Sequence, residues 1–79
     1  MGTHSMKAVH LEESLNRRLE RLVLEMCQQE IRLPLALREL EKKFLQVVLQ
    51  QCGGNQTRAA RLLGIHRNTL AHKIQNHCL

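Results

Sequence analysis

The chain has 79 residues, one of them aromatic, and a formal net charge of +5 at pH 7. This length allows one small domain, and no run of about 18 apolar residues is present that could span a membrane. Three cysteines without a C-x-x-C pair argue against a disulfide framework, and a single proline among many Leu, Glu, Arg and Gln residues favours helices.

Charge is distributed unevenly along the chain. All seven acidic residues lie at or before Glu41, whereas residues 42–79 contain six basic residues and no acidic one. A basic half without acids beside a nearly neutral half indicates a polyanion-binding end joined to a protein-binding end.

The N-terminal part is predicted to hold a short leader and one amphipathic helix. Residues 1–5 look like an expression leader ahead of a natural start at Met6, so residues 6–79 are expected to form one domain. A helix is predicted from about His10 to Gln29, because apolar residues recur every three or four positions: Leu11, Leu15, Leu19, Leu22 and Met26. The stripe either packs within its own chain or, as we favour for so short a chain, forms a contact between subunits.

A second helix is predicted from Pro34 to about Gln51, with the proline in its first turn and Gly53-Gly54 after its end. Its apolar stripe contains Leu37, Leu40, Phe44, Val47 and Val48. Because five of the six residues from Phe44 to Leu49 are apolar, we expect burial on most sides, as at the centre of an intertwined dimer. Residues 10–51 are therefore assigned to dimerisation.

Residues 55–77 have the pattern of a helix-turn-helix. Asn55 is a good N-cap for a helix that runs to about Leu63, and a second helix is expected from Arg67 to Asn76. Gly64 permits the tight turn between them, and the small pair Ala59-Ala60 permits close crossing of the two helices.

The second of these helices has an inward and an outward face. Leu70 and Ile74 are expected to point inward. The outward residues are polar, small or basic, without an acid: Arg67, Asn68, Ala71, His72 and Gln75. Such a face can enter a DNA major groove, where Arg pairs with guanine and Asn or Gln with adenine. The alternative is a helical hairpin with a solvated polar face.

The stretch GNQTRAARLLGIHRNTLAHKI resembles the C-terminal motif of the Fis family of bacterial DNA-binding proteins. It is also similar to the DNA-binding domains of NtrC-type activators of the alternative sigma factor. The motif covers residues 54–78, and the order of the preceding helices extends the resemblance over most of residues 11–79. It implies an all-α subunit of four helices, the first two intertwined in a homodimer and the last two forming the helix-turn-helix.

The resemblance also implies roles for individual residues. Arg67 is the base-contacting arginine, with His66, His72 and Asn68 as further groove contacts. Phosphate contacts are expected from Asn55, Thr57, Arg58, Thr69 and Lys73, since a helix N-terminus with nearby hydroxyl and guanidinium groups suits an anion. The expected dimer contacts are Leu15, Leu19, Leu22, Met26, Phe44, Val47 and Val48. Ala71 stands where Fis has a basic residue, which predicts a shallower salt dependence of binding.

The resemblance implies the function of a sequence-tolerant, DNA-bending homodimer, a transcription regulator or nucleoid-associated protein of the bacterial cytoplasm. Its partners would be double-stranded DNA and a second copy, with no membrane or small-molecule ligand. No catalytic constellation, cofactor or metal site is expected, since His66, His72, His77 and Cys78 lack the spacing of a helical metal site. The alternatives are a domain of an NtrC-type activator and a coiled-coil adaptor without affinity for DNA.

Overall fold

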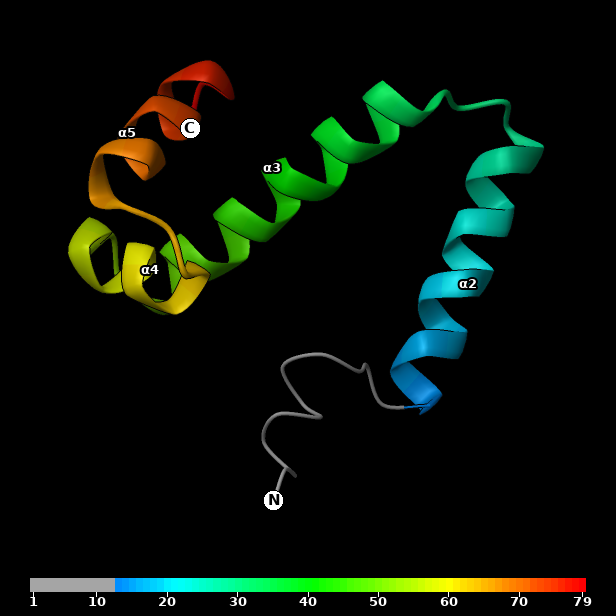
Figure 1. Cartoon of the computed structure of the whole chain (residues 1–79), viewed down its shortest axis with the longest axis horizontal. Coiled ribbons are helices and arrows are strands. Elements are labelled where there is room, and N and C mark those ends of the chain that lie inside the picture. The colour runs from blue at the N-terminus through cyan, green and yellow to red at the C-terminus, as the bar shows by residue number, and fades with distance from the viewer. Residues whose placement is uncertain (1–12) are drawn as a thin grey trace. The chain divides into compact units, whose positions relative to one another are not determined.

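The computed structural model of the chain describes residues 13–79, which contain four α-helices and no strand (Figure 1). This confirms the expected all-α class. The chain divides between Leu33 and Pro34 into two compact units. The expected leader, residues 1–5, and the expected start of the first helix, residues 10–12, lie outside the described residues. Within the described part, no helix has both the length and the apolar character needed to cross a membrane.

The described part of the N-terminal unit contains helix α2, Glu13–Gln28. An i, i+4 ion pair joins Arg17 Nη2 to Glu13 Oε2 at 3.1 Å on its polar face. The apolar stripe of α2 is exposed in the single chain, with Leu15, Leu19 and Leu22 each about two-fifths exposed or more, while Met26 is partly buried. Cys27 is exposed as well, because it continues this uncovered stripe.

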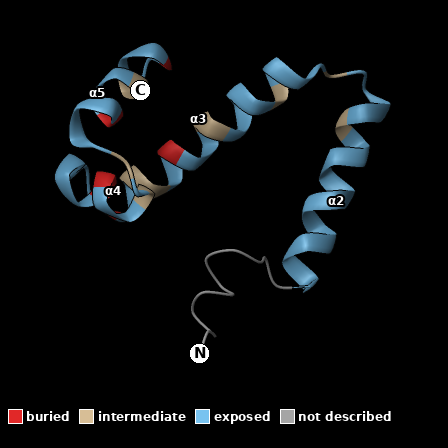
Figure 2. Ribbon diagram, in the orientation of Figure 1, coloured by how far each residue is buried: buried red, intermediate tan, exposed pale blue. Residues whose placement is uncertain are grey.

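Helix α3, Leu33–Gln51, begins one residue earlier than predicted, with Pro34 in its first turn. One side of it is buried at Leu45 and partly buried at Val48 and Leu49. Most of α3 is exposed (Figure 2). Four residues of its predicted apolar stripe are exposed: Leu37, Leu40, Phe44 and Val47. In the single chain the other helices of this unit cover only the Leu45 side of α3, so its burial on most sides stays an expectation for a dimer.

Helices α4, Gln56–Leu63, and α5, Arg67–Asn76, have the predicted bounds and complete the C-terminal unit. Together with the C-terminal half of α3 they enclose its core, which consists of Leu45, Cys52, Ala59, Ala60 and Leu70. Partly buried residues close around these five, among them Leu63, Ile65 and Ile74. The helix-turn-helix is thus held on α3 by a small apolar core.

All four helices end in the same way. A residue with positive φ follows each helix, namely Glu30 (59°), Gly53 (61°), Gly64 (72°) and Cys78 (58°). The next amide N–H then donates to a carbonyl five residues back: Ile31 to Met26, Gly54 to Leu49, Ile65 to Ala60 and Leu79 to Ile74, each at 2.9–3.0 Å. This is the Schellman closure, which satisfies terminal carbonyls that would otherwise lack donors.

Candidate nucleic-acid interface

The turn of the helix-turn-helix is built from small residues and one left-handed glycine. Ala59 is fully buried and Ala60 is 3% exposed, so α4 meets its neighbours without intervening bulk. Gly64 follows α4 with φ 72° and ψ 27°, and its amide N–H faces the carbonyls of Ala60 and Arg61. The sequence prediction for this turn is confirmed.

Helix α5 has the two faces that the sequence predicted. Leu70 is fully buried and Ile74 partly buried, so this side anchors the helix to the core. All five residues expected to face outward are exposed: Arg67, Asn68, Ala71, His72 and Gln75. His66 occupies the N-cap position of α5, but its exposed side chain makes no capping hydrogen bond. A polar and basic helix surface without an acid is therefore presented to solvent.

The N-terminus of α4 lies at the surface. Asn55 is its N-cap, as predicted, and its Oδ1 accepts a hydrogen bond from the amide N–H of Arg58 at 3.1 Å. The amides of Gln56 and Thr57 belong to the first turn, where a helix offers N–H groups without intrahelical acceptors. The side chains of Thr57 and Arg58 are exposed beside them. This arrangement suits an anion such as phosphate, because N–H donors, a hydroxyl and a guanidinium are combined.

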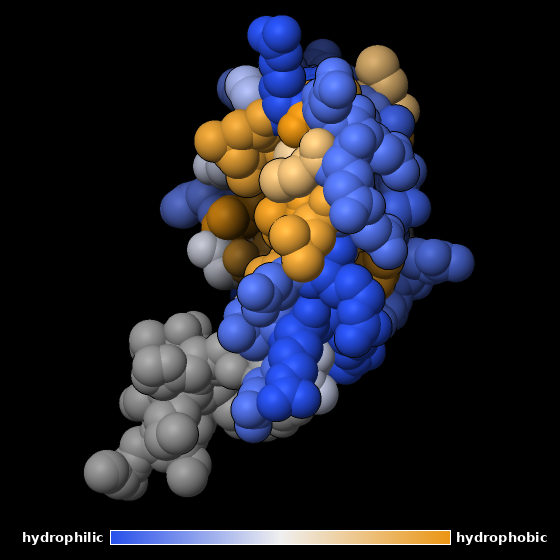
Figure 3. All heavy atoms as spheres, turned by 90° about the vertical axis from the view of Figure 1, so that its right-hand side faces the viewer, coloured by the Kyte–Doolittle hydropathy of each residue, from blue (hydrophilic) through white to orange (hydrophobic). Residues whose placement is uncertain are grey.

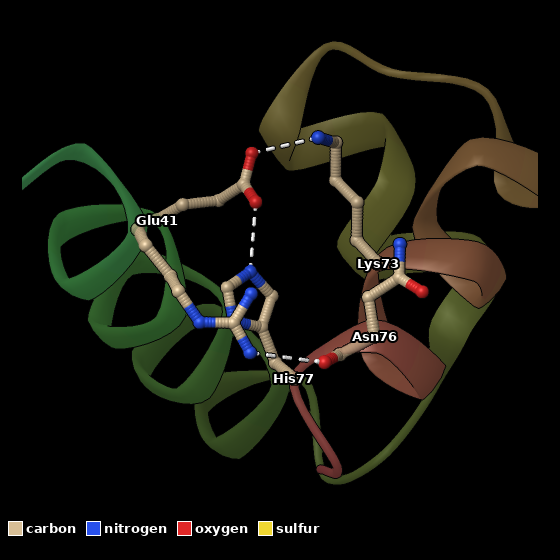
Figure 4. Close-up of polar contacts among 5 residues, drawn as sticks. Glu41, Lys73, Asn76 and His77 are labelled. Carbon is tan, nitrogen blue, oxygen red and sulfur yellow. Dashed lines mark hydrogen bonds and ion pairs between the residues drawn. The ribbon is translucent and has the colours of Figure 1, made fainter. Parts of the chain in front are cut away.

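A cluster of three ionisable side chains joins α5 to α3 (Figure 4). Lys73 Nζ lies 2.6 Å from Glu41 Oε2, and His77 Nε2 lies 2.8 Å from Glu41 Oε1. The hydrogen bonds from His77 and from Lys73, in that order of size, hold the pKa of Glu41 below its ordinary value of 4.5. The Glu41 carboxylate is therefore charged at neutral pH and is engaged through both oxygens.

His77 is the most deeply buried member of this cluster, with a side chain only 2% exposed. Its Nδ1 is buried without a hydrogen-bond partner among the described residues. Because the Glu41 carboxylate can only accept, Nε2 of His77 carries a proton and donates it to Glu41.

A further hydrogen bond joins the same two helices. Arg38 Nη2 donates to the backbone carbonyl oxygen of Asn76 at 3.2 Å, near the carboxyl end of α5. Cations are favoured there, because the last carbonyls of a helix lack intrahelical donors. The orientation of α5 on α3 thus depends on polar contacts as well as on the apolar core.

Sequence reasoning missed Glu41, His77 and Arg38 at this site, and it gave Lys73 a different partner. Lys73 was expected to contact phosphate, but in the structure its amino group is paired with Glu41. A signal was present, since Lys73 lies three residues after Leu70 and His77 lies three after Ile74. That spacing places both beside the inward residues, on the side toward α3. The partner on α3 could not be identified from spacing alone.

Comparison with known proteins gives a consistent answer. A sequence model described as the bacterial regulatory proteins of the Fis family matches residues 36–77. Over 45 residues, or 57% of this chain, it is 47% identical to a Fis-like DNA-binding protein of Neisseria meningitidis serogroup A. Over the same length it is 53% identical to a Fis-like DNA-binding protein of Xylella fastidiosa strain Temecula1 and 49% identical to DNA-binding protein Fis of Buchnera aphidicola from Acyrthosiphon pisum.

The matched stretch covers 57%, 50% and 46% of these three relatives, so the chain spans about half the length of the curated relatives it matches. No solved structure matches the chain. The family model covers more than half of the chain and includes nearly all of the C-terminal unit. The chain therefore belongs to the Fis family of bacterial regulatory proteins.

Proposed function

We propose that the chain is a DNA-binding protein that inserts helix α5 into the major groove and acts in transcription regulation. The observation that supports this most directly is the exposed face of α5, which combines Arg67 with polar side chains and no acid. A helix of this kind, anchored by a second short helix across a glycine turn, is the usual element for base contacts. Relatives in the Fis family are named as DNA-binding proteins.

The proposed contacts fall into two classes. Base edges are contacted by Arg67 at the start of α5, with His66, Asn68 and His72 on the same exposed surface. Phosphates are contacted by Asn55, Thr57 and Arg58 at the start of α4 and by Thr69 on α5. Because phosphate contacts carry no sequence information, and because Arg67 is the only permanent cation among the proposed base contacts, binding tolerates many sequences.

A homodimer is the second part of the proposal. The apolar stripes of α2 and α3 are exposed in the single chain, and apolar side chains gather at the surface in the view of Figure 3. Part of the α3 stripe lines an open groove of about 460 Å³ that also includes Leu63 and Ile65. A second copy that covers these faces would remove their apolar area from water, which stabilises the dimer by roughly 25 cal/mol per Å².

DNA bending follows from the dimer. Two recognition helices in a dimer this small are expected to lie closer together than one turn of DNA, about 34 Å, so a straight duplex cannot contact both. Bending costs on the order of 1–6 kcal/mol, and it favours sequences that deform easily. The protein would thus be a binding protein without enzymatic activity, located in the cytoplasm on the bacterial nucleoid. A domain of an NtrC-type activator is not favoured, since the relatives described above are named Fis or Fis-like.

The test is DNA binding over a salt series, first on a random-sequence pool and then on the duplexes enriched from it. Wild type should bind with a steep salt dependence. Arg67→Ala should lose about 1–3 kcal/mol on the enriched DNA and little on the pool. Arg61→Ala, which removes the same charge from an exposed position of α4, is the matched control and should affect both DNAs alike. A dimer without salt-sensitive affinity for any duplex would instead be a helical interaction module.

A further inference from the structure

We propose that Glu41 acts as an internal counterion that keeps Lys73 from contacting DNA phosphates and thereby limits non-specific binding. The proposal rests on the DNA binding proposed above. It assigns a role in the electrostatic part of DNA binding to a residue of α3 that lies outside the recognition helix.

The geometry of the pair supports this role. Lys73 Nζ lies 2.6 Å from Glu41 Oε2, and the lysine side chain is only one-third exposed. The second carboxylate oxygen is held at 2.8 Å by His77, whose own side chain is almost completely buried (Figure 4). Because His77 holds the carboxylate from the core side, an outward movement of Glu41 with Lys73 would break this second hydrogen bond. A phosphate near Lys73 would have to compete with this carboxylate for the charge of the ammonium group.

Of the acidic residues in the C-terminal unit, Glu41 is the one that contacts α5. The C-terminal unit, residues 34–79, contains two acidic residues, Glu39 and Glu41. Glu39 is exposed and forms no ion pair within the described part of the chain, whereas Glu41 contacts α5 through both of its oxygens. The hydrogen bonds from His77 and Lys73 lower the pKa of Glu41, so that the carboxylate stays ionised at neutral pH.

The consequence concerns the salt-dependent part of the affinity for DNA. Each phosphate neutralised by a cation adds about 0.9 to the magnitude of the slope of log K against log salt on duplex DNA, whatever the sequence. A lysine that is already neutralised by a carboxylate adds little to this slope. Base contacts from Arg67 are not affected by the pair, since Arg67 lies on the exposed face of α5. Glu41 therefore lowers the part of the affinity that comes from phosphate contacts, which is all that random-sequence DNA offers.

The test compares four variants with wild type on random-sequence duplexes over a salt series. These are Glu41→Gln, Lys73→Gln, the double variant, and Glu39→Gln as the matched control, which removes the same charge from the same helix. Glu41→Gln should release Lys73 and steepen the slope by about 0.9. Glu39→Gln, Lys73→Gln and the double variant should all keep the wild-type slope. Circular dichroism establishes that each variant is folded.

Two results would overturn the proposal while wild type still binds DNA. If Lys73→Gln alone flattens the slope by about 0.9, Lys73 contacts phosphate despite Glu41. If Glu41→Gln and Glu39→Gln change binding equally, the effect is a long-range one of charge and does not pass through Lys73. If Glu41→Gln does not fold, the salt slope of Lys73→Gln alone tests the proposal. Failure of the proposed function is distinguishable, because wild type would then show no salt-dependent binding at all.

Discussion

At Gly64 the backbone has φ 72°, and a Cβ added there would meet no atom within 4 Å. The requirement for glycine is therefore conformational and not steric. We expect Gly64→Ala to lower the free energy of unfolding by about 1 kcal/mol, because a side chain is strained in the left-handed region. Urea denaturation measures this, and an unchanged stability would show that the turn relaxes to another geometry.

Glu30 presents the reverse case, since it has φ 59° without being glycine. We predict that Glu30→Gly is more stable than Glu30→Ala by about 1 kcal/mol, because both remove the carboxylate and only glycine relieves the left-handed strain. Denaturation of the two variants side by side measures the difference. Equal stabilities would mean that the closure of α2 is frayed in solution.

The ion pairs of Glu41 make the free energy of unfolding depend on pH. The pKa of Glu41 is lowered from 4.5 in the folded chain by its hydrogen bonds to His77 and Lys73. A carboxyl with a lower pKa in the folded state stabilises the fold above its unfolded pKa and loses that contribution as the pH falls through the folded pKa.

We therefore expect wild type to be more stable than Glu41→Gln at neutral pH, and the difference to shrink as the pH falls below 4.5. Denaturation curves over this range measure it. The stability of Glu39→Gln should follow that of wild type over the same pH range, because Glu39 is exposed and forms no ion pair within residues 13–79. A constant difference between wild type and Glu41→Gln would contradict the prediction.

At the scale of helices, the contact between α4 and its neighbours depends on two alanines. Ala59 is completely buried, so Ala59→Leu adds three carbons where no room exists. Overpacking of this kind costs about 1–3 kcal/mol and should also displace α5. We expect both stability and DNA affinity to fall. Gln56→Leu, the same new side chain at an exposed position of α4, is the control and should leave stability within about 0.5 kcal/mol.

Much of the helical layout is predictable because its signals are local. Spacings of three and four residues mark the faces, while Pro34, Asn55 and Gly64 mark ends that the structure confirms. The pairing of Glu41 with Lys73 and His77 is not predictable in this way, since the partners are 32 and 36 residues apart. Whether Phe44 or Leu45 faces the core of its own chain likewise depends on how helices pack. Both lie in one apolar run, yet Leu45 is 2% exposed and Phe44 is 57% exposed.

For the whole molecule, the proposed dimer should make stability depend on protein concentration. We predict that Phe44→Gln removes this dependence and costs about 3 kcal/mol or more, because an aromatic ring is lost from a buried interface. Leu62→Gln is the control, since Leu62 is 61% exposed on α4 outside the predicted interface. Denaturation at several concentrations, with sedimentation, measures both. A monomer of unchanged stability would refute the interface.

Helix α3 has two neighbouring apolar faces, one around Leu45 that holds the helix-turn-helix and one around Phe44 that is proposed to meet the second copy. In each subunit this one helix of 19 residues, about 28 Å long, would then connect the two-fold axis of the proposed dimer to the helix-turn-helix. If the α3 helix of one subunit slid or rotated against that of the other, the distance between the two α5 helices of the dimer would change. Substitutions on α3 alone would therefore adapt the dimer to DNA sites whose two halves lie at a different distance, with every base-contacting residue unchanged.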